Sequence, residues 1–360
     1  MENSAKKTVA VLFGGVSNEH DVSVVSANNV IANIPKDKYT VAPVYITKDG
    51  EWLLYDGGAA IADVKWVVHG TPAVLSPDKK CGGILRTVGD KAKMIRIDVV
   101  FPLIHGRNGE DGTVQGLCEL AGLPYVGCGV LSSAACMDKT FTKIIAKSAG
   151  VNQADFIVCK KSEIQNEDSL NEIIKKIRYK LGYPCFVKPA RGGSSIGISK
   201  AENKESLKEA LFTAAKEDDK ILVEKAIIGR ELECAVLGNE NPITSVIGEI
   251  TYSDTFYTYD AKYNSKDSKT LTDPVLQEGV AERIQQEALK VYSALECSGM
   301  ARVDFFYDEE KDKIIFNEIN TVPGFTNISM YSMLWAHAGI SFPELVDRLI
   351  TLAFEKKGVE

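Results

Sequence analysis

The chain has 360 residues, of which 45% are hydrophobic and 25% charged, and its formal net charge is −7 at pH 7. This length and apolar content suit two or three packed globular units with sizeable cores. The acidic balance excludes the global positive field that draws a protein to nucleic acid or anionic lipid, so we expect neither as a partner.

The first 128 residues predict an α/β unit that opens with a strand, a glycine turn and a helix. Strand patterns occur at residues 6–15, 39–50 and 97–106. Helix patterns occur at residues 113–122 and 21–34, the latter with Asp21 as N-cap. This alternation predicts a mostly parallel sheet with helices on both faces.

Two further units follow. Residues 134–150 predict one helix that ends at Gly150, and residues 219–225 predict a strand that closes the second unit. The third unit contains a polar, tyrosine-rich loop at 251–273 and a helix at 281–299. Since no low-complexity linker separates these stretches, we expect packed domains at residues 1–128, 129–224 and 225–360.

The stretch VKPARGGSSIGISK, residues 187–200, predicts a phosphate-binding loop between two strands. Its glycines let backbone N–H groups approach phosphate oxygens, Ser194 and Ser195 add donors, and Lys188 adds a charge. Neither a P-loop nor a complete dinucleotide turn occurs elsewhere in the chain. The alternative is a flexible hairpin with solvated cations, and the pattern assigns no partner to Arg191.

Two β-rich runs, residues 301–307 and 313–320, flank a polar turn and predict an antiparallel hairpin. With the turn centred near residue 311, Asp304 faces Glu318 and Arg302 faces Asn320, all on one side of the sheet. Two carboxylates and an amide are hard oxygen ligands that suit Mg²⁺ shared with phosphates. The alternative is an exposed charged face.

Single acidic and histidine residues carry weaker signals. Glu224 and Glu231 flank a strand-hinge-strand segment that can present its backbone to an adenine edge, although such residues are usually solvated. Glu19 stands where a strand turns into a helix, which suits ligand binding or capping equally. His105 lies in a glycine-rich turn, where a histidine is more often structural.

The apolar stretch near the N-terminus, residues 9–13, is too short for a signal-peptide core, and no run approaches the roughly 20 apolar residues of a membrane helix. We therefore expect a cytoplasmic protein without a membrane partner. The eight cysteines are dispersed without a CxxC motif, and the four histidines form no HExxH motif. This favours buried free thiols over disulfides or a zinc site.

Taken in order along the chain, GGVSNEHDVS, HGRNGEDG, MDK, VKPARGGSSIG, YDAKY, RVDFFY and FNEINTVPGF resemble the D-alanine-D-alanine ligases of the ATP-grasp superfamily. The resemblance covers essentially the whole chain. It implies three domains, an N-terminal parallel α/β domain and two α+β domains that clasp ATP. It also implies a homodimer and a role in making the cell-wall dipeptide of peptidoglycan.

The resemblance assigns the nucleotide and metal contacts. ATP would be held by Lys139, Lys188, Gly193, Ser194, Ser195, Glu224, Lys225, Ile227, Glu231 and Lys262. Two Mg²⁺, with Mn²⁺ as an alternative, would be held by Asp304, Glu318 and Asn320. A monovalent cation such as K⁺ would be a further cofactor.

The resemblance also assigns the amino-acid site. Glu19 would bind the ammonium of the first D-alanine in a network with Ser194 and Tyr263, and Arg302 with the Gly324 amide would form an oxyanion hole. The D-alanines would further contact His105, Ser329 and Met330. ATP would convert the first D-alanine into an acyl phosphate, which the amine of the second D-alanine would attack.

The identity of the second substrate depends on a few positions. Tyr263 favours an amine over D-lactate, and the apolar Met330 suits D-alanine where D-serine ligases of the vancomycin-resistance type carry arginine. D-alanine-D-serine ligase therefore remains the alternative, because Asn327, Ile328 and Ser332 depart from the usual family pattern. Another carboxylate-amine ligase, or a nucleotide-binding module without turnover, fits the motifs less well.

Overall fold

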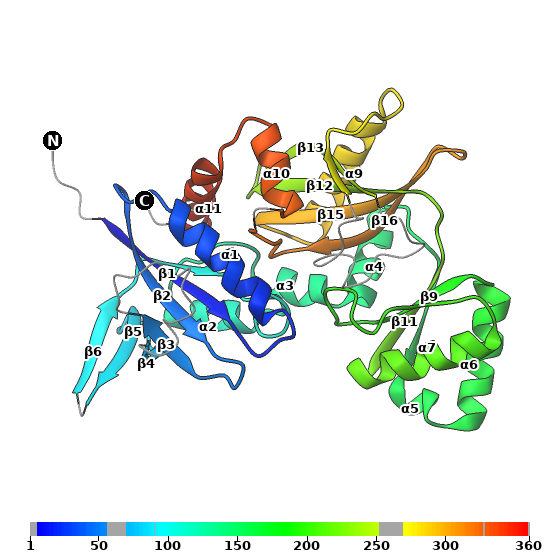
Figure 1. Cartoon of the computed structure of the whole chain (residues 1–360), viewed down its shortest axis with the longest axis horizontal. Helices are drawn as coiled ribbons and strands as arrows, with labels where there is room; N and C mark the ends of the chain where they lie inside the picture. The colour runs from blue at the N-terminus through cyan, green and yellow to red at the C-terminus, as the bar shows by residue number, and fades with distance from the viewer. Residues whose placement is uncertain (1–5, 56–69, 90, 252–268, 327, 359–360) are drawn as a thin grey trace.

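The computed structural model describes residues 6–55, 70–89, 91–251, 269–326 and 328–358. Its strands form three sheets, and each sheet draws its strands from one continuous stretch of the chain. Figure 1 shows the first sheet in blue and cyan, the second in green beside it, and the third in yellow and orange above both. The ATP-grasp architecture expected from the sequence is confirmed, while the exact domain boundaries stay a prediction.

The first sheet has seven strands in the order β6-β5-β4-β3-β2-β1-β7. Its strands are β1 (Lys7–Gly14), β2 (Tyr39–Ile46), β3 (Trp52–Tyr55), β4 (Gly70–Leu75), β5 (Gly83–Val88), β6 (Lys91–Arg96) and β7 (Val99–Pro102). β1 pairs in parallel with β2 and β7, as predicted. The strands β3 to β6 extend the sheet as an antiparallel meander that was not predicted, because each is only four to six residues long. The prediction of a mostly parallel sheet is therefore correct only for β1, β2 and β7.

Two helices cover opposite faces of this sheet, α1 (His20–Asn33) and α2 (Thr113–Ala121). Side chains alternate along β1, so Val9 and Val11 pack in the same core as Val30 of α1. Leu12 points the other way and packs in the core that includes Val114 of α2. The predicted N-cap was wrong: Glu19 occupies the N-cap position of α1, without a capping hydrogen bond from its side chain, and Asp21 lies in the first turn, because the chain already turns at Ser17 to His20.

The single helix predicted at 134–150 is two helices, α3 (Val130–Met137) and α4 (Lys139–Ser148). Asp138 breaks the helix between them with extended backbone angles, φ −94° and ψ 101°. Its carboxylate accepts hydrogen bonds from the backbone N–H groups of Thr140 and Phe141, so it caps α4. The break places Lys139 at the first position of α4, facing the second sheet.

The second sheet is antiparallel, with the order β10-β9-β11-β8. This unit consists of β8 (Phe156–Lys160), α5 (Lys161–Ile164), α6 (Glu167–Lys180), β9 (Cys185–Pro189), β10 (Ser199–Ala201), α7 (Lys204–Glu217) and β11 (Lys220–Lys225). Its helices pack on one face in a core formed entirely by residues between 157 and 223. The opposite face, which carries Phe186, Lys188 and Glu224, is turned toward the third sheet.

The third sheet is antiparallel and ordered β14-β13-β12-β15-β16. Its unit consists of β12 (Arg230–Gly238), β13 (Ile243–Thr251), β14 (Lys269–Thr272), α9 (Val280–Ala294), β15 (Gly299–Asp308), β16 (Lys313–Asn320), α10 (Met330–His337) and α11 (Phe342–Lys357). Unlike the second unit, it shares a core with the first: Val9 and Phe101 lie in one buried cluster with Leu334 and Phe354. Figure 1 accordingly shows α11 beside α1.

All eight cysteines are free, and all but Cys81 are buried, which confirms the prediction of reduced thiols. No helix in the described part of the chain combines the length and the apolar content needed to cross a membrane.

Candidate active site

The loop between β9 and β10, residues 190–198, is held by several anchors along its length. The backbone N–H of Lys139 donates to the Ala190 carbonyl at 2.9 Å, and its Nζ donates to the Gly192 carbonyl at 2.7 Å. Ser194 and Ser195 both have positive φ angles, 49° and 58°, so the backbone turns sharply at the two serines. The predicted loop between two strands is confirmed, and these anchors favour a held loop over a flexible hairpin with solvated cations.

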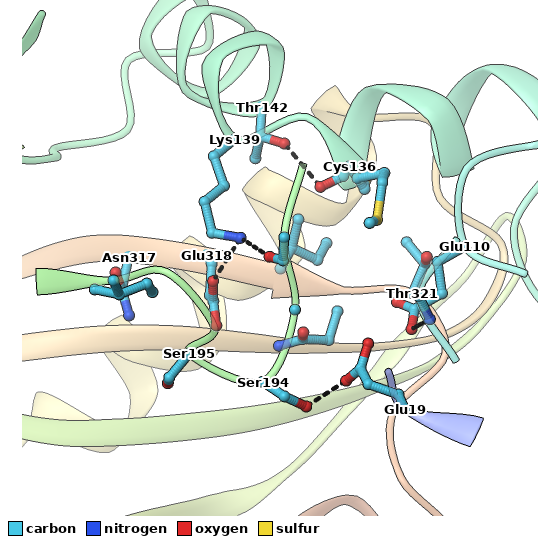
Figure 2. A pocket seen from close by; sticks show the side chains of 17 residues that line it. Glu19, Glu110, Cys136, Lys139, Thr142, Ser194, Ser195, Asn317, Glu318 and Thr321 are labelled. Carbon is cyan, nitrogen blue, oxygen red and sulfur yellow. Dashed lines mark hydrogen bonds and ion pairs between the residues drawn. The ribbon is translucent and has the colours of Figure 1, made fainter. Parts of the chain in front are cut away.

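The tip of this loop touches the start of α1. The Ser194 hydroxyl donates a hydrogen bond to the Glu19 carboxylate, as Figure 2 shows. A Cβ on Gly193 would lie 2.5 Å from Glu19 Oε2, so this position has no space for a side chain. The third predicted member of the network, Tyr263, and the neighbouring Lys262 lie outside the described residues.

The hairpin of β15 and β16 has the predicted register. Asp304 pairs with Glu318 and Arg302 pairs with Asn320, and a register shift follows immediately after Asp304. Arg302 donates from Nε to Asp304 Oδ1 at 2.8 Å and from Nη2 to Oδ2 at 2.7 Å, and Asn320 Nδ2 donates to Asp304 Oδ2 at 3.1 Å. The expected ligands therefore form one polar surface.

Cations already face these carboxylates. Arg302 Nε also lies 3.1 Å from Glu233 Oε2, and Lys139 Nζ lies 3.5 Å from Glu318 Oε2. Burial alone lowers the pKa of Arg302, but the charges of Asp304 and Glu233 raise it well above its usual value. The surface therefore combines anionic oxygens with fixed positive charge, as a site for a metal-phosphate group requires.

The oxygen donors fit a hard divalent cation in type. Asp304 and Glu318 supply carboxylates and Asn320 supplies an amide from neighbouring strands. Within the described ranges, no three acidic, histidine or cysteine side chains cluster as a metal site, so the set has two carboxylates and depends on the amide. Such a sparse protein set suits a cation whose other ligands are phosphate oxygens and water.

A cavity of about 440 Å³ lies between the second and third sheets. Its apolar walls come from both sheets and from the hinge after β11, and they include Phe186, Ile227, Phe306, Ile315 and Phe316. Its polar rim includes Lys188, Glu224, Lys225 and Glu231. Apolar walls around a few polar groups suit a flat ring with hydrogen-bonding edges.

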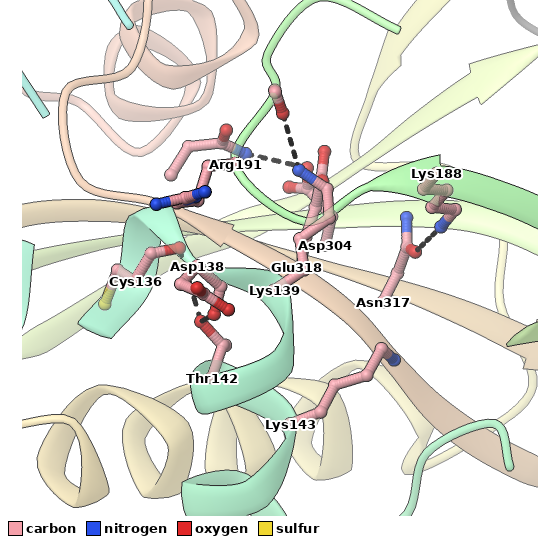
Figure 3. Close-up of polar contacts among 12 residues, drawn as sticks. Cys136, Asp138, Lys139, Thr142, Lys143, Lys188, Arg191, Asp304, Asn317 and Glu318 are labelled. Carbon is pink, nitrogen blue, oxygen red and sulfur yellow. Dashed lines mark hydrogen bonds and ion pairs between the residues drawn. The ribbon is translucent and has the colours of Figure 1, made fainter. Parts of the chain in front are cut away.

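Glu224 lies at the centre of a buried ion network in this cavity. Lys143 Nζ is 2.5 Å from Glu224 Oε1, and Lys188 Nζ is 2.6 Å from Oε2. Burial raises the pKa of the Glu224 carboxyl, but the two ammonium groups outweigh it and lower the pKa to about 2. Figure 3 shows Lys139, Lys143 and Lys188 around the strand that carries Asn317 and Glu318.

The sequence patterns alone did not identify Lys143, Phe186 or Phe306 as candidates. Lys143 follows Lys139 by four residues, so both lie on one face of α4, and this spacing was an available signal. Phe186 precedes Lys188 by two residues on β9 and therefore shares its face of the sheet. Either spacing points to a site residue only once Lys139 and Lys188 are already known to face the site.

A second hollow lies at the glycine-rich loop, where Glu19, Glu318 and Asn320 line it. A third hollow, of about 330 Å³, lies between the first unit and the third sheet, and its lining residues from distant parts of the chain include Glu19, His105, Arg302, Asn320, Gly324, Ser329 and Met330. Glu19 and Asn320 line both the second and the third hollow, and Glu318 lines both the second hollow and the cavity of about 440 Å³. The hollows therefore share walls. A nucleotide in the cavity between the second and third sheets can direct its phosphates toward a small carboxylic acid in the hollow beside Glu19.

His105 lines this hollow and is also hydrogen-bonded within the protein at both ring nitrogens. Nε2 lies 3.0 Å from Ser26 Oγ, and Nδ1 lies 3.1 Å from the Val322 carbonyl. Ser329 Oγ accepts from the Thr326 backbone N–H at 2.9 Å. Met330 is buried and packs against Gly248, so the wall at this point is apolar.

Known proteins match the chain over nearly its whole length. Family descriptions named D-ala D-ala ligase N-terminus and D-ala D-ala ligase C-terminus match residues 8–128 and 145–351. A D-alanine-D-alanine ligase of Caldicellulosiruptor bescii is 50% identical over 351 residues, which cover 98% of this chain and 96% of the relative. One of Acetivibrio thermocellus is 48% identical over 367 residues, covering 98% and 96%.

Solved structures agree with these relatives. The VanG D-Ala:D-Ser ligase from Enterococcus faecalis superposes with a TM-score of 0.87 at 40% identity, covering 97% of this chain and 99% of that one. The D-alanine-D-alanine ligase from Coxiella burnetii superposes with a TM-score of 0.87 at 34% identity, covering 99% and 96%.

Proposed function

Because this chain belongs to the D-alanine-D-alanine ligase family, we propose that it uses ATP to join two D-alanines into D-alanyl-D-alanine, a peptidoglycan precursor. The observation that carries the proposal is the row of adjoining hollows, in which Glu19 and Ser194 are hydrogen-bonded beside the Asp304 and Glu318 surface. A carboxylate that can hold an ammonium group thus lies next to groups that can hold phosphate.

The cavity between the second and third sheets would hold the adenine and ribose. Ile227 and Phe186 offer apolar faces, the hinge offers backbone groups, and Glu231 would accept from ribose hydroxyls. Lys139, Lys188 and the backbone of Gly193 to Ser195 would contact the phosphates. Lys225 and the undescribed Lys262 complete the proposed set.

Asp304, Glu318 and Asn320 would hold two Mg²⁺, with Mn²⁺ as an alternative and K⁺ as a further cation. When bound, these ions neutralise charge on the transferring phosphoryl group. The same reaction uses the protein's own cations, since Lys139 and Arg302 already face this surface.

In the first step the carboxylate of the bound D-alanine attacks the γ-phosphorus of ATP, and the bond from this phosphorus to the bridging oxygen of the β-phosphate breaks. The products are an acyl phosphate of D-alanine and ADP. Glu19 holds the ammonium group of that D-alanine, and Ser194 fixes the Glu19 carboxylate. Tyr263 would join this network. Little covalent chemistry is required of the protein, so positioning and charge supply the catalysis.

In the second step the amine of the other D-alanine attacks the acyl carbonyl and phosphate leaves. Arg302 and the Gly324 amide would stabilise the tetrahedral oxyanion, and both line the same hollow. Ser329 would receive the carboxylate of the second D-alanine at the far wall. Closure of the hollow against water would protect the acyl phosphate.

D-alanine is the second substrate that the pocket favours. Met330 is 4% exposed and forms an apolar wall that suits a methyl group, whereas a hydroxymethyl group would lack a partner there. The similarity to the VanG D-Ala:D-Ser ligase keeps D-alanine-D-serine ligation as the second candidate. Ser332 turns inward and donates to the Ser329 carbonyl at 3.0 Å, so it offers no free hydroxyl to D-serine.

The function is tested by measuring phosphate release with ATP and Mg²⁺ in the presence of D-alanine alone, D-alanine with D-serine, and D-alanine with D-lactate. Mass spectrometry identifies the product. We expect D-alanyl-D-alanine as the dominant product. Absence of D-alanine-dependent turnover would refute the ligase, whereas a dominant D-alanyl-D-serine product would refute the second substrate alone.

Arg191, which the sequence left without a partner, tethers the glycine-rich loop. It donates from Nη2 to Asp218 Oδ1 at 2.5 Å, and its backbone N–H donates to Asp218 Oδ2 at 2.8 Å. We expect Arg191→Ala to raise the KM for ATP about threefold with little change in kcat, because the Arg191 side chain is half exposed and the buried Asp218 keeps its hydrogen bonds from the backbone N–H groups of Arg191 and Lys220. Steady-state kinetics with varied ATP measure this, and Arg178→Ala, an exposed arginine of the same unit, is the control.

We further propose a cytoplasmic homodimer, as in the family. Analytical ultracentrifugation of the purified chain tests the dimer, and fractionation of the host cells tests the location. A monomer at micromolar concentration would contradict the first proposal.

A further inference from the structure

Two polar side chains of α1 reach out of the first unit and bind the loop that carries Gly324. Ser26, fully buried, accepts a hydrogen bond from the Phe325 backbone N–H at 3.2 Å. Asn29, one turn later, donates from Nδ2 to the Phe325 carbonyl at 2.9 Å. Both backbone groups of the residue after Gly324 are therefore fixed by one helix.

His105 fixes the other side of the same loop. Since Ser26 Oγ already accepts from Phe325, its own hydrogen can be donated to His105 Nε2, which leaves Nδ1–H to donate to the Val322 carbonyl. The chain of hydrogen bonds starts at Phe325 and ends at Val322, so it encloses Gly324. Every donor in this chain of hydrogen bonds faces an acceptor when neutral His105 carries its proton on Nδ1.

The loop has little freedom beyond these bonds. Phe325 is fully buried, and its ring packs edge-on against Phe101 of β7 and against Tyr331 of α10. A Cβ on Gly324 would lie 2.7 Å from Ser329 Oγ, so this position has no space for a side chain. The direction of the Gly324 amide is therefore determined by contacts from both ends of the chain.

We propose that Ser26 and Asn29 are positioning residues that set the oxyanion hole from α1. The inference rests on the proposed function, because it assigns them a part in its second step. α1 follows directly on Glu19, which holds the first D-alanine, so one rigid helix fixes both the ammonium site and the Gly324 amide. The helix thereby sets the place of the acyl carbonyl relative to its oxyanion donor.

The test compares Ser26→Ala with Ser23→Ala. Both serines are fully buried on α1, but the Ser23 hydroxyl bonds Leu103 and Gly14 inside the first unit. A second pair is Asn29→Ala with Asn33→Ala, since Asn33 donates only within α1, to the Asn29 carbonyl. Each pair removes the same group from the same helix, and only the first member loses the bond to the loop.

We expect Ser26→Ala and Asn29→Ala to lower kcat about 10-fold while the KM for ATP stays within about twofold, because displacing an oxyanion donor costs less than deleting one. Formation of the acyl phosphate should then be faster than its reaction with the second D-alanine. Acid quench at short times, followed by hydroxylamine trapping, should reveal acyl phosphate approaching one per site in these variants. The two control variants should resemble the wild type in both measurements.

The inference is overturned if kcat is unchanged in both Ser26→Ala and Asn29→Ala, if it falls without acyl-phosphate accumulation, or if the control variants show the same accumulation. A chain that forms no dipeptide at all even as wild type would instead refute the proposed function. Because Asn29 is only half buried, its variant remains informative if Ser26→Ala does not fold.

Discussion

Replacing Asp304 with asparagine is expected to lower kcat about 100-fold while changing the affinity for ATP less than about threefold. Asp304 lines the cavity between the second and third sheets, where it belongs to the polar surface that β15 and β16 form with Glu318. The adenine would instead lie against the apolar walls of this cavity, which include Phe186 and Ile227. The variant keeps the shape of the side chain but loses the charge that pairs with Arg302 and that the proposed divalent cation would use. The loss therefore falls on phosphoryl transfer and on the orientation of Arg302.

Steady-state turnover and calorimetric titration with ATP in the absence of D-alanine measure the two effects separately. Asp308→Asn is the matched control, since Asp308 lies on the same strand and pairs with Lys311 at the surface. The control should retain turnover. If Asp304→Asn leaves turnover unchanged, Asp304 takes no part in the reaction. If the affinity for ATP falls by the same factor as turnover, Asp304 contributes to nucleotide binding and not specifically to phosphoryl transfer.

Replacing Glu224 with glutamine is expected to destabilise the folded protein by about 3 kcal/mol at neutral pH. The carboxylate is 4% exposed and contacts Lys143 and Lys188, so the amide leaves two buried ammonium groups without their anion. A pKa lowered from 4.5 to about 2 corresponds to about the same free energy. Urea unfolding of both proteins measures the difference.

The contribution of Glu224 to the free energy of unfolding depends on pH. Since the folded-state pKa of Glu224 is depressed, its stabilisation is complete above about pH 4.5 and is lost as the pH falls toward about 2. The difference between wild type and Glu224→Gln should therefore shrink over this range. Glu172→Gln is the control, because Glu172 pairs with Lys175 in solvent and such pairs contribute at most about 1 kcal/mol. Equal losses in both variants would contradict the buried network.

The register of the β15 and β16 hairpin was predictable because the alternation of side chains and a short polar turn restrict how two strands can pair. The strand positions around the glycine-rich loop were predictable for the same local reason. The break in the helix predicted at residues 134–150 could not be predicted from the local pattern, because the apolar spacing continues through Asp138. The Asp138 side chain nevertheless caps a new helix, α4. The local pattern also failed for β3 to β6, because strands of four to six residues give too short an alternation to be distinguished from loops.

Contacts between units were not readable from the residues alone. The bond from Ser194 to Glu19 joins positions 175 residues apart, and the resemblance to a family supplied that pairing. The bond from Ser26 to Phe325 joins positions 299 residues apart, and a serine within an apolar helix face gives no local sign of such a partner. Lys143 was not identified from the sequence, because burial of a lysine depends on an anion from another strand.

The core that joins the first and third units constrains the order in which the chain can fold during synthesis. One face of β1 packs with α1 and also with residues as late as Phe354, so that face is not fully covered until the ribosome has made almost the whole chain. The second unit needs only residues between 157 and 223 for its core and can fold while the rest is still being translated. The earliest strand to emerge is thus among the last to be fully buried, and during this interval α1 is the neighbouring helix that covers its apolar side chains.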